Sequence, residues 1–196
     1  MNRRRILPIA LGVVLLALLA WGVTATLERL ARPEPAPADA AAAPAPGAET
    51  PHIAATLFYA SAEGDSLVAV RREVALAEGI DAQGRQIVMA QLGPAPAPHV
   101  SVIPKGTTLR AFFVTERGDA FVDLSPEVST AHPGGSLTEL LTVHAIVNAV
   151  TANLPAIQRV QITVNGKEVD TLAGHVDIRR PLVRDASLVS DESAAP

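Results

Sequence analysis

Short runs in which apolar and polar residues alternate open the folded part of the chain. The run 52–60 (HIAATLFYA) and the run 66–76 (SLVAVRREVAL) are separated by the turn residues 63–65 (Glu-Gly-Asp). A strand with one buried face has this period, because successive side chains point to opposite faces. We therefore predict two strands joined by a turn.

The same alternation returns twice further along the chain. In 108–124 it surrounds the turn 116–119 (Glu-Arg-Gly-Asp), and in 159–172 it surrounds Asn165-Gly166. Asn-Gly tolerates the positive φ values that a two-residue hairpin loop requires. We predict a hairpin in each segment. The Arg-Gly-Asp triplet at the first tip is typical of a tight turn and is given no separate function.

Two segments have helical spacing instead. The segment 80–94 has a candidate N-cap in Asp81 and ends in a Gly-Pro pair. The segment 134–155 places Ser136 three residues before Glu139, which predicts a capping box in which each side chain satisfies a backbone donor of the other residue. The apolar stripe of this second helix is formed by Leu140, Val143, Val147, Val150 and Leu154.

These elements follow the order ββαββαββ across one domain, residues 52–185. Alternation in the strands indicates one buried and one wetter sheet face, and the two helices are available to cover the buried one. We predict an α+β fold: a two-layer sandwich in which a mainly antiparallel sheet of about six strands carries both helices on one face. A domain of this size can bury a working core without metal or disulfide.

The beginning of the chain has a different pattern. Residues 1–5 contain three consecutive arginines, and residues 6–27 form an uncharged run of 22 residues. A helix of that length covers the hydrocarbon core of a bilayer, and the basic tip favours a cytoplasmic N-terminus. We predict an N-terminal transmembrane helix that leaves the rest of the chain outside the cytoplasmic membrane. The alternative is a signal peptide, for which Val23-Thr24-Ala25 offers a cleavage site.

Two further segments flank the predicted domain. Residues 28–51 consist largely of Ala, Pro and a few acids, a composition that favours extended polyproline II and buries nothing. We predict that this segment is a semi-rigid stalk. Residues 186–196 are predicted to be a flexible tail.

Composition excludes several classes of function. The chain has no cysteine, which excludes disulfides, thiol catalysis and zinc–thiolate sites. It has 16 Lys and Arg against 20 Asp and Glu, and three of the arginines belong to the basic tip. With so few aromatic residues besides, the chain lacks the basic footprint of a nucleic-acid-binding protein, and we expect no nucleic-acid partner.

The segment 172–182 (LAGHVDIRRPL) is the one stretch that suggests an active site. His175 and Asp177 point to the same side of a strand and could be two ligands of a metal. The alternative, which we prefer, is a structural clasp in which both side chains bond neighbouring backbone and the arginines discourage edge pairing. No nucleophile motif, opposed carboxylate pair or phosphate loop was found. We assign no catalytic residue, metal or cofactor.

Several stretches, in order, resemble the GerMN domain of bacterial envelope and spore-germination proteins. They are AVRREV (69–74), SVIPKGTTL (101–109), VDLSPEV (122–128), GGSLTELLTVHAIVNAVT (134–151) and VQITVNGKEVDTLAGHVDIRRPL (160–182). The sequence departs from the family pattern at His144, where an aromatic such as Tyr is expected, and at Ile178-Arg179. A membrane helix also replaces the lipid anchor of many members.

The resemblance implies an α+β module outside the membrane, similar to ring-building domains, with no established catalytic activity. Our leading hypothesis is a single-pass envelope protein with a non-enzymatic scaffold or interaction domain, which binds an envelope protein and assists assembly of an envelope or germination-type complex. Oligomerisation is compatible with this role. The alternatives are a cell-wall hydrolase accessory that uses His175 and Asp177, and a small-ligand binder with a cleft beside the loop 94–107.

Overall fold

The structure is a computed structural model and describes residues 51–190. The predicted basic tip and transmembrane helix lie outside the described residues, as do the stalk up to residue 50 and the tail beyond residue 190. Residues 51–190 contain no helix that is both long and apolar enough to cross a membrane.

The first sheet is built from strands at both ends of the domain. β1 (His52–Ala60) and β2 (Leu67–Ala75) form the predicted antiparallel pair, in a register that places Thr56 opposite Arg71. A third strand, β6 (Val189–Ser190), runs parallel to β2 beside its first two residues. The strand order is β1-β2-β6, so β2 lies in the middle.

The second sheet is formed by three strands from the centre of the chain. β3 (Leu109–Val114) and β4 (Asp119–Leu124) are the predicted hairpin, and β5 (Arg159–Val164) lies parallel to β4 on its other side. The helix α4 (Ser136–Asn153) is part of the crossover between β4 and β5. A crossover of this kind is what a parallel pair of strands requires.

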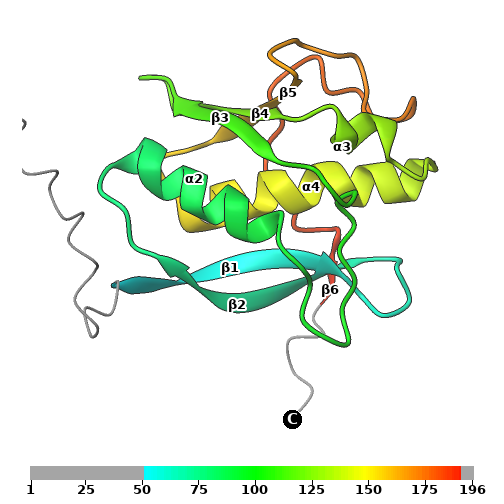
Figure 1. Cartoon of the computed structure of the whole chain (residues 1–196), viewed down its shortest axis with the longest axis horizontal. Coiled ribbons are helices and arrows are strands. Elements are labelled where there is room, and N and C mark those ends of the chain that lie inside the picture. Colours follow the sequence, from blue (N-terminus) through cyan, green and yellow to red (C-terminus); the bar gives the residue numbers. More distant parts are fainter. Residues whose placement is uncertain (1–50, 191–196) are drawn as a thin grey trace, which may run out of the picture. The chain divides into compact units, whose positions relative to one another are not determined.

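The helices form a layer between the two sheets. α2 (Ile80–Gln91) and α4 lie side by side, with β1 and β2 on one side of them and β3, β4 and β5 on the other (Figure 1). A short helix, α3 (Glu127–Thr130), follows β4. Because α4 has a sheet on each side, every residue from 141 to 150 is buried. A helix covered on both sides is apolar around its whole circumference rather than along one stripe.

The predicted architecture was therefore correct in class and wrong in arrangement. The fold is α+β, but the strands form two three-stranded sheets around the helices, not one sheet with the helices on one face. The second strand of the hairpin predicted in 159–172 is not formed: Asn165 and Gly166 make the turn with positive φ, but the pairing across this turn is a single isolated bridge between Val164 and Lys167. The sixth strand is β6, within the segment 186–196 that was predicted to be a tail.

The two predicted N-caps were also wrong. Gly79 precedes α2 and Gly135 precedes α4, both with positive φ, and neither helix has a side-chain cap hydrogen bond. Asp81 instead accepts a hydrogen bond from the backbone N–H of Val114, at the edge of the second sheet. The side chain of Glu139 turns into the protein, where it bonds to the backbone of Leu172. Glycine replaces the predicted caps because only glycine adopts these left-handed conformations without strain.

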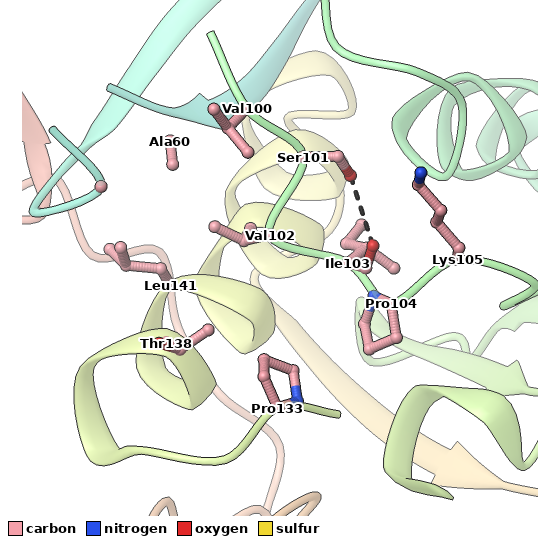
Figure 2. Close-up of a pocket in the computed structure, with 11 residues that line it drawn as sticks. Ala60, Val100, Ser101, Val102, Ile103, Pro104, Lys105, Pro133, Thr138 and Leu141 are labelled. Atoms are coloured by element: carbon pink, nitrogen blue, oxygen red, sulfur yellow. Dashed lines mark hydrogen bonds between the residues drawn. The ribbon is translucent and has the colours of Figure 1, made fainter. Parts of the chain in front are cut away.

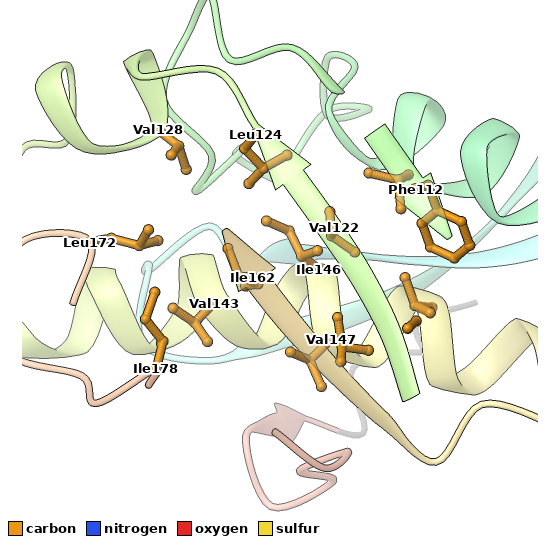
Figure 3. Close-up of a cluster of buried hydrophobic side chains, with 14 of the residues drawn as sticks. Phe112, Val122, Leu124, Val128, Val143, Ile146, Val147, Ile162, Leu172 and Ile178 are labelled. Atoms are coloured by element: carbon orange, nitrogen blue, oxygen red, sulfur yellow. The ribbon is translucent and has the colours of Figure 1, made fainter. Parts of the chain in front are cut away.

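The core consists of two clusters, one between the helices and each sheet. The larger cluster lies against the second sheet, and Figure 3 shows its side chains, among them Phe112, Val122, Ile146 and Ile162. The smaller cluster lies against the first sheet. It contains Ala55, Leu57, Phe58, Tyr59, Leu67, Val74, Ile87, Leu141, Ala145 and Ala149.

Two amide side chains attach β1 to the helices. Gln91 of α2 accepts from the backbone N–H of Phe58 at 2.8 Å and donates to its carbonyl at 2.6 Å. Asn153 of α4 does the same for Thr56, at 2.8 and 2.7 Å. These bonds satisfy backbone groups on the side of β1 that faces away from β2, so part of this edge is closed by the protein's own side chains.

Candidate functional site

The clasp, residues 172–182, is organised around a carboxylate from a distant part of the sequence. Glu139, in the first turn of α4, has no exposed side-chain surface. One of its oxygens accepts from the backbone N–H groups of Leu172 and Ala173, both at 2.8 Å. The other accepts from the backbone N–H of His175 at 2.8 Å and lies 3.2 Å from its ring nitrogen Nδ1. The start of the clasp is therefore wrapped around one buried charge.

The charge of Glu139 is maintained by this arrangement. Burial acts to raise the pKa of the carboxyl group, but the backbone donors of the clasp lower it by more, and the net pKa is below its ordinary value. A carboxylate that accepts several backbone hydrogen bonds is stabilised in its charged form. Both oxygens are engaged, so the group is arranged as a structural anchor and not as a proton donor or acceptor for a substrate.

His175 and Asp177, the two residues singled out from the sequence, have separate partners. The ring of His175 contacts Glu139, and its side chain is 45% exposed. Asp177 is exposed and forms a two-pronged ion pair with Arg179, at 2.9 Å to Nε and 2.6 Å to Nη2. These hydrogen bonds hold the pKa of Asp177 well below its usual range. Within residues 51–190 no three His, Cys, Asp or Glu side chains come together in a way that could hold a metal.

Sequence reasoning singled out the segment 172–182 but not its centre, and residues 175–177 do not form the strand on which His175 and Asp177 were placed. Asp177 does accept from neighbouring backbone, the N–H of Arg179 at 3.0 Å, as the clasp hypothesis required. His175 instead bonds to the side chain of Glu139, which had been assigned to a capping box with Ser136. The available signal was an acid in a helix that is otherwise strongly apolar, and such a position can equally be explained by a cap.

Two further histidines lie before α4 or within it, of which His132 is partly buried and His144 is buried. His132 accepts from the backbone N–H of Gly134 at 3.0 Å, and its other ring nitrogen lies 3.1 Å from the hydroxyl of Thr142. His144, on α4, is buried, and its Nδ1 has no hydrogen-bond partner among residues 51–190. Burial lowers the pKa of both rings. Both are therefore neutral in the folded protein near pH 7.

The surface is hollowed on either side of the loop 100–105. Figure 2 shows the first hollow, of about 350 Å³, between this loop, the end of β1 and the start of α4. The second, of about 480 Å³, lies between the loop and residues 92–95. The residues that line both are Val100, Ser101, Ile103, Pro104 and Lys105. Both hollows border the loop 94–107, beside which the sequence suggested a ligand cleft.

The lining of these hollows is mainly apolar. Val100 is 53% exposed, and its backbone is fixed by two hydrogen bonds to Ala60. Lys105 is the only charged side chain among the residues that line both hollows. Ser101 directs its hydroxyl to the carbonyl of Ile103, at 3.4 Å. An open apolar surface with few polar groups suits docking of another chain better than binding of a polar substrate.

Comparison with known proteins decides the family. The model of the Germane family, described as "Sporulation and spore germination", matches residues 56–170, more than half of the chain. The chain belongs to the Germane family. The resemblance to GerMN domains seen in the sequence is thereby confirmed. No curated protein matches the chain significantly.

Solved structures agree with this assignment at the level of the fold. The tandem GerMN domains of the sporulation protein GerM from Bacillus subtilis are 21% identical with a TM-score of 0.58, covering 74% of this chain and 52% of that one. The first GerMN domain of GerM alone is 21% identical with a TM-score of 0.53, covering 67% of this chain and 98% of that one. This chain thus spans about half of the tandem structure and nearly all of one GerMN domain.

The Germane match leaves out the clasp, whose backbone N–H groups bond to the buried carboxylate of Glu139. It includes Glu139 on α4 but ends at Asp170, just before the backbone donors of the clasp and well before β6. Glu139 therefore connects the part of the domain that the Germane model matches, residues 56–170, to the clasp that follows this part in the sequence.

Proposed function

We propose that this Germane protein is a single-pass envelope protein whose outer domain is a non-enzymatic interaction module in a complex of the sporulation or germination type. The family description supports the process. The uncharged run 6–27 behind a basic tip supports the anchor. The apolar surface around the loop 100–105 carries the proposal of an interaction module, because it is hollowed, open and poor in polar groups.

The partner proposed for this surface is a protein segment with apolar side chains and an acidic residue. Apolar side chains would fill the hollows on the two sides of Val100 and Pro104. Lys105, at the rim of both, would attract a carboxylate from the partner. The carboxylates of Glu139 and Asp177 already have partners within the domain. They therefore do not compete with a carboxylate of the partner for Lys105.

A cross-linking pull-down from native membranes tests the docking surface. Val100→Asp should abolish capture of the partner, because it places a charge between the two hollows, while the exposed side chain leaves the fold intact. Val183→Asp is the matched control, because Val183 is 60% exposed and belongs to neither hollow. Capture that survives Val100→Asp as well as Val183→Asp would rule out this surface.

Topology is tested separately. Protease added to spheroplasts should digest residues beyond about position 28 and leave the first 27 residues embedded. Recovery of the intact chain from treated spheroplasts, or of the domain as a free soluble fragment from untreated cells, would contradict the anchor.

A further inference from the structure

Within residues 51–190, the first sheet has an open edge along β2. β6 covers this edge only beside Leu67 and Val68, and no other described strand pairs with the remaining residues of β2 on that side. At the far end the edge closes again, because Gln83 donates to the carbonyl of Ala75 and accepts from the N–H of Ala77. The open part is therefore short and lies between Ala69 and Val74.

The backbone groups that face this opening can be identified from the strand register. The N–H of Leu67 donates to the carbonyl of Leu188, on the side away from β1. Because alternate residues of a strand direct their backbone groups to the same side, those of Ala69, Arg71 and Glu73 also face away from β1. Arg71 and Glu73 are exposed. An exposed edge of this kind is a template for another strand.

The sequence of the open edge is complementary to itself. Residues 69–75 read AVRREVA. If a second copy pairs antiparallel with Arg72 on the two-fold axis, Arg71 lies opposite Glu73 of the other copy, and Val70 lies opposite Val74. Arg71 and Glu73 both present their backbone groups outward, so the same register that forms the hydrogen bonds also pairs opposite charges.

Neighbouring registers are less favourable. Moving the axis to Arg71 would place two Arg71 side chains opposite each other, which is destabilising, and would leave no opposite-charge pair to offset them. Moving it to Val70 would direct Glu73 of one copy against Leu67 of the other, where β6 already lies. In the favoured register one like-charge pair, Arg72 with its copy, lies on the axis and opposes the pairing. The two Arg71–Glu73 pairs on the other face of the strand offset it.

We infer that the open edge of β2 is a self-association surface, at which a second copy of this chain joins the two first sheets into one continuous sheet. The pairing is isologous and closes after two copies. It goes beyond the proposed function, because it needs no envelope partner. The paired stretch is short compared with stable interfaces, so the dimer is weak and depends on concentration.

The absence of cysteine from the chain provides a clean test. Arg72→Cys places one thiol on the proposed axis, where the two Cα atoms of a non-hydrogen-bonded antiparallel pair lie about 4.5 Å apart, within reach of a disulfide. Mild oxidation of the purified full-length variant should give a covalent dimer. Val183→Cys, also exposed, is the control and should remain monomeric under the same oxidation.

Charge exchange tests the register without cysteine. Arg71→Glu and Glu73→Arg should each lower the dimer fraction in sedimentation of the full chain, because each creates like-charge pairs. The double variant should restore it, because the pairs are opposite again. A double variant that remains as monomeric as the single ones would overturn the register.

Other occupants of the edge give different results. If residues 191–196 of the same chain continue β6 along β2, the Arg72→Cys dimer should form only when the chain ends at Ser190. If a strand of another protein is the occupant, Arg72→Cys should give no dimer in either length. Both outcomes would overturn self-association, and neither would change the result expected for Val100→Asp.

Discussion

Glu139 holds the clasp because a carboxylate can accept on both oxygens, and a change of one atom tests this. In Glu139→Gln the amide nitrogen would replace one acceptor and face the backbone N–H groups that now bond to it. Unpaired buried donors cost free energy, so the free energy of unfolding should fall by on the order of 3 kcal/mol in urea melts. Glu168→Gln, at an exposed position shortly after the turn 165–166, is the control. An equal, small effect of both variants would show that the clasp does not depend on Glu139.

His144 gives the stability a pH dependence of known sign. Its pKa is held below the ordinary 6.5 by burial, against the opposing attraction of Asp185. The unfolded chain therefore binds a proton as pH falls through about 6.5, while the folded protein does not until lower pH, and the free energy of unfolding decreases over that range. His144→Phe should reduce this decrease between pH 7.5 and 5.5 in urea melts. An unchanged pH dependence would show that His144 does not contribute to it.

At the scale of elements, the close approach of α2 to β3 explains a glycine that looks unfavourable in the sequence. A Cβ at Gly84 would lie 2.1 Å from the ring of Phe112, which is fully buried. Gly84→Ala should therefore lower the free energy of unfolding by about 2 kcal/mol through overpacking, although alanine favours helix. Thermal melts of a double-mutant cycle with Phe112→Leu should show that the smaller side chain relieves most of this loss. Additive effects would contradict the contact.

The elements also show what the sequence could and could not specify. The alternation of apolar residues was enough to predict β1, β2, β3 and β4, and helical spacing predicted α2 and α4, because these patterns are local. β6 has two residues and depends on a neighbour more than a hundred positions away, so it left no pattern. The predicted capping box of α4 was wrong for a related reason. Ser136 and Glu139 have the spacing of a capping box, but the backbone of residues 172–175 offers Glu139 more donors.

The local pattern of apolar residues could not predict the arrangement of the layers either. A stripe on α4 was predicted from five apolar positions, yet Ala145, Ala149 and Thr142 are buried as well. Small residues let one sheet approach a helix closely while larger ones face the other sheet. The sequence of α4 is therefore compatible with one covered face or two, and only the assembled molecule distinguishes them.

At the scale of the whole molecule, α2 and α4 belong to both core clusters and should make the two sheets unfold together. Ile87 and Leu141 pack toward the first sheet, while Val88 and Ile146 pack toward the second.

Ile162, on β5, is 1% exposed, and Ile162→Ala should destabilise the second sheet by about 2–5 kcal/mol. If the helices couple the layers, the slowest-exchanging backbone amides of β1 should lose the same amount of protection as those of β5 in native-state hydrogen exchange. Ala54→Gly, an exposed change in β1, serves as a control with a small effect on both sheets. Protection of β1 that stays at its wild-type level in Ile162→Ala would show instead that each sheet opens on its own, with the helix layer dividing the domain.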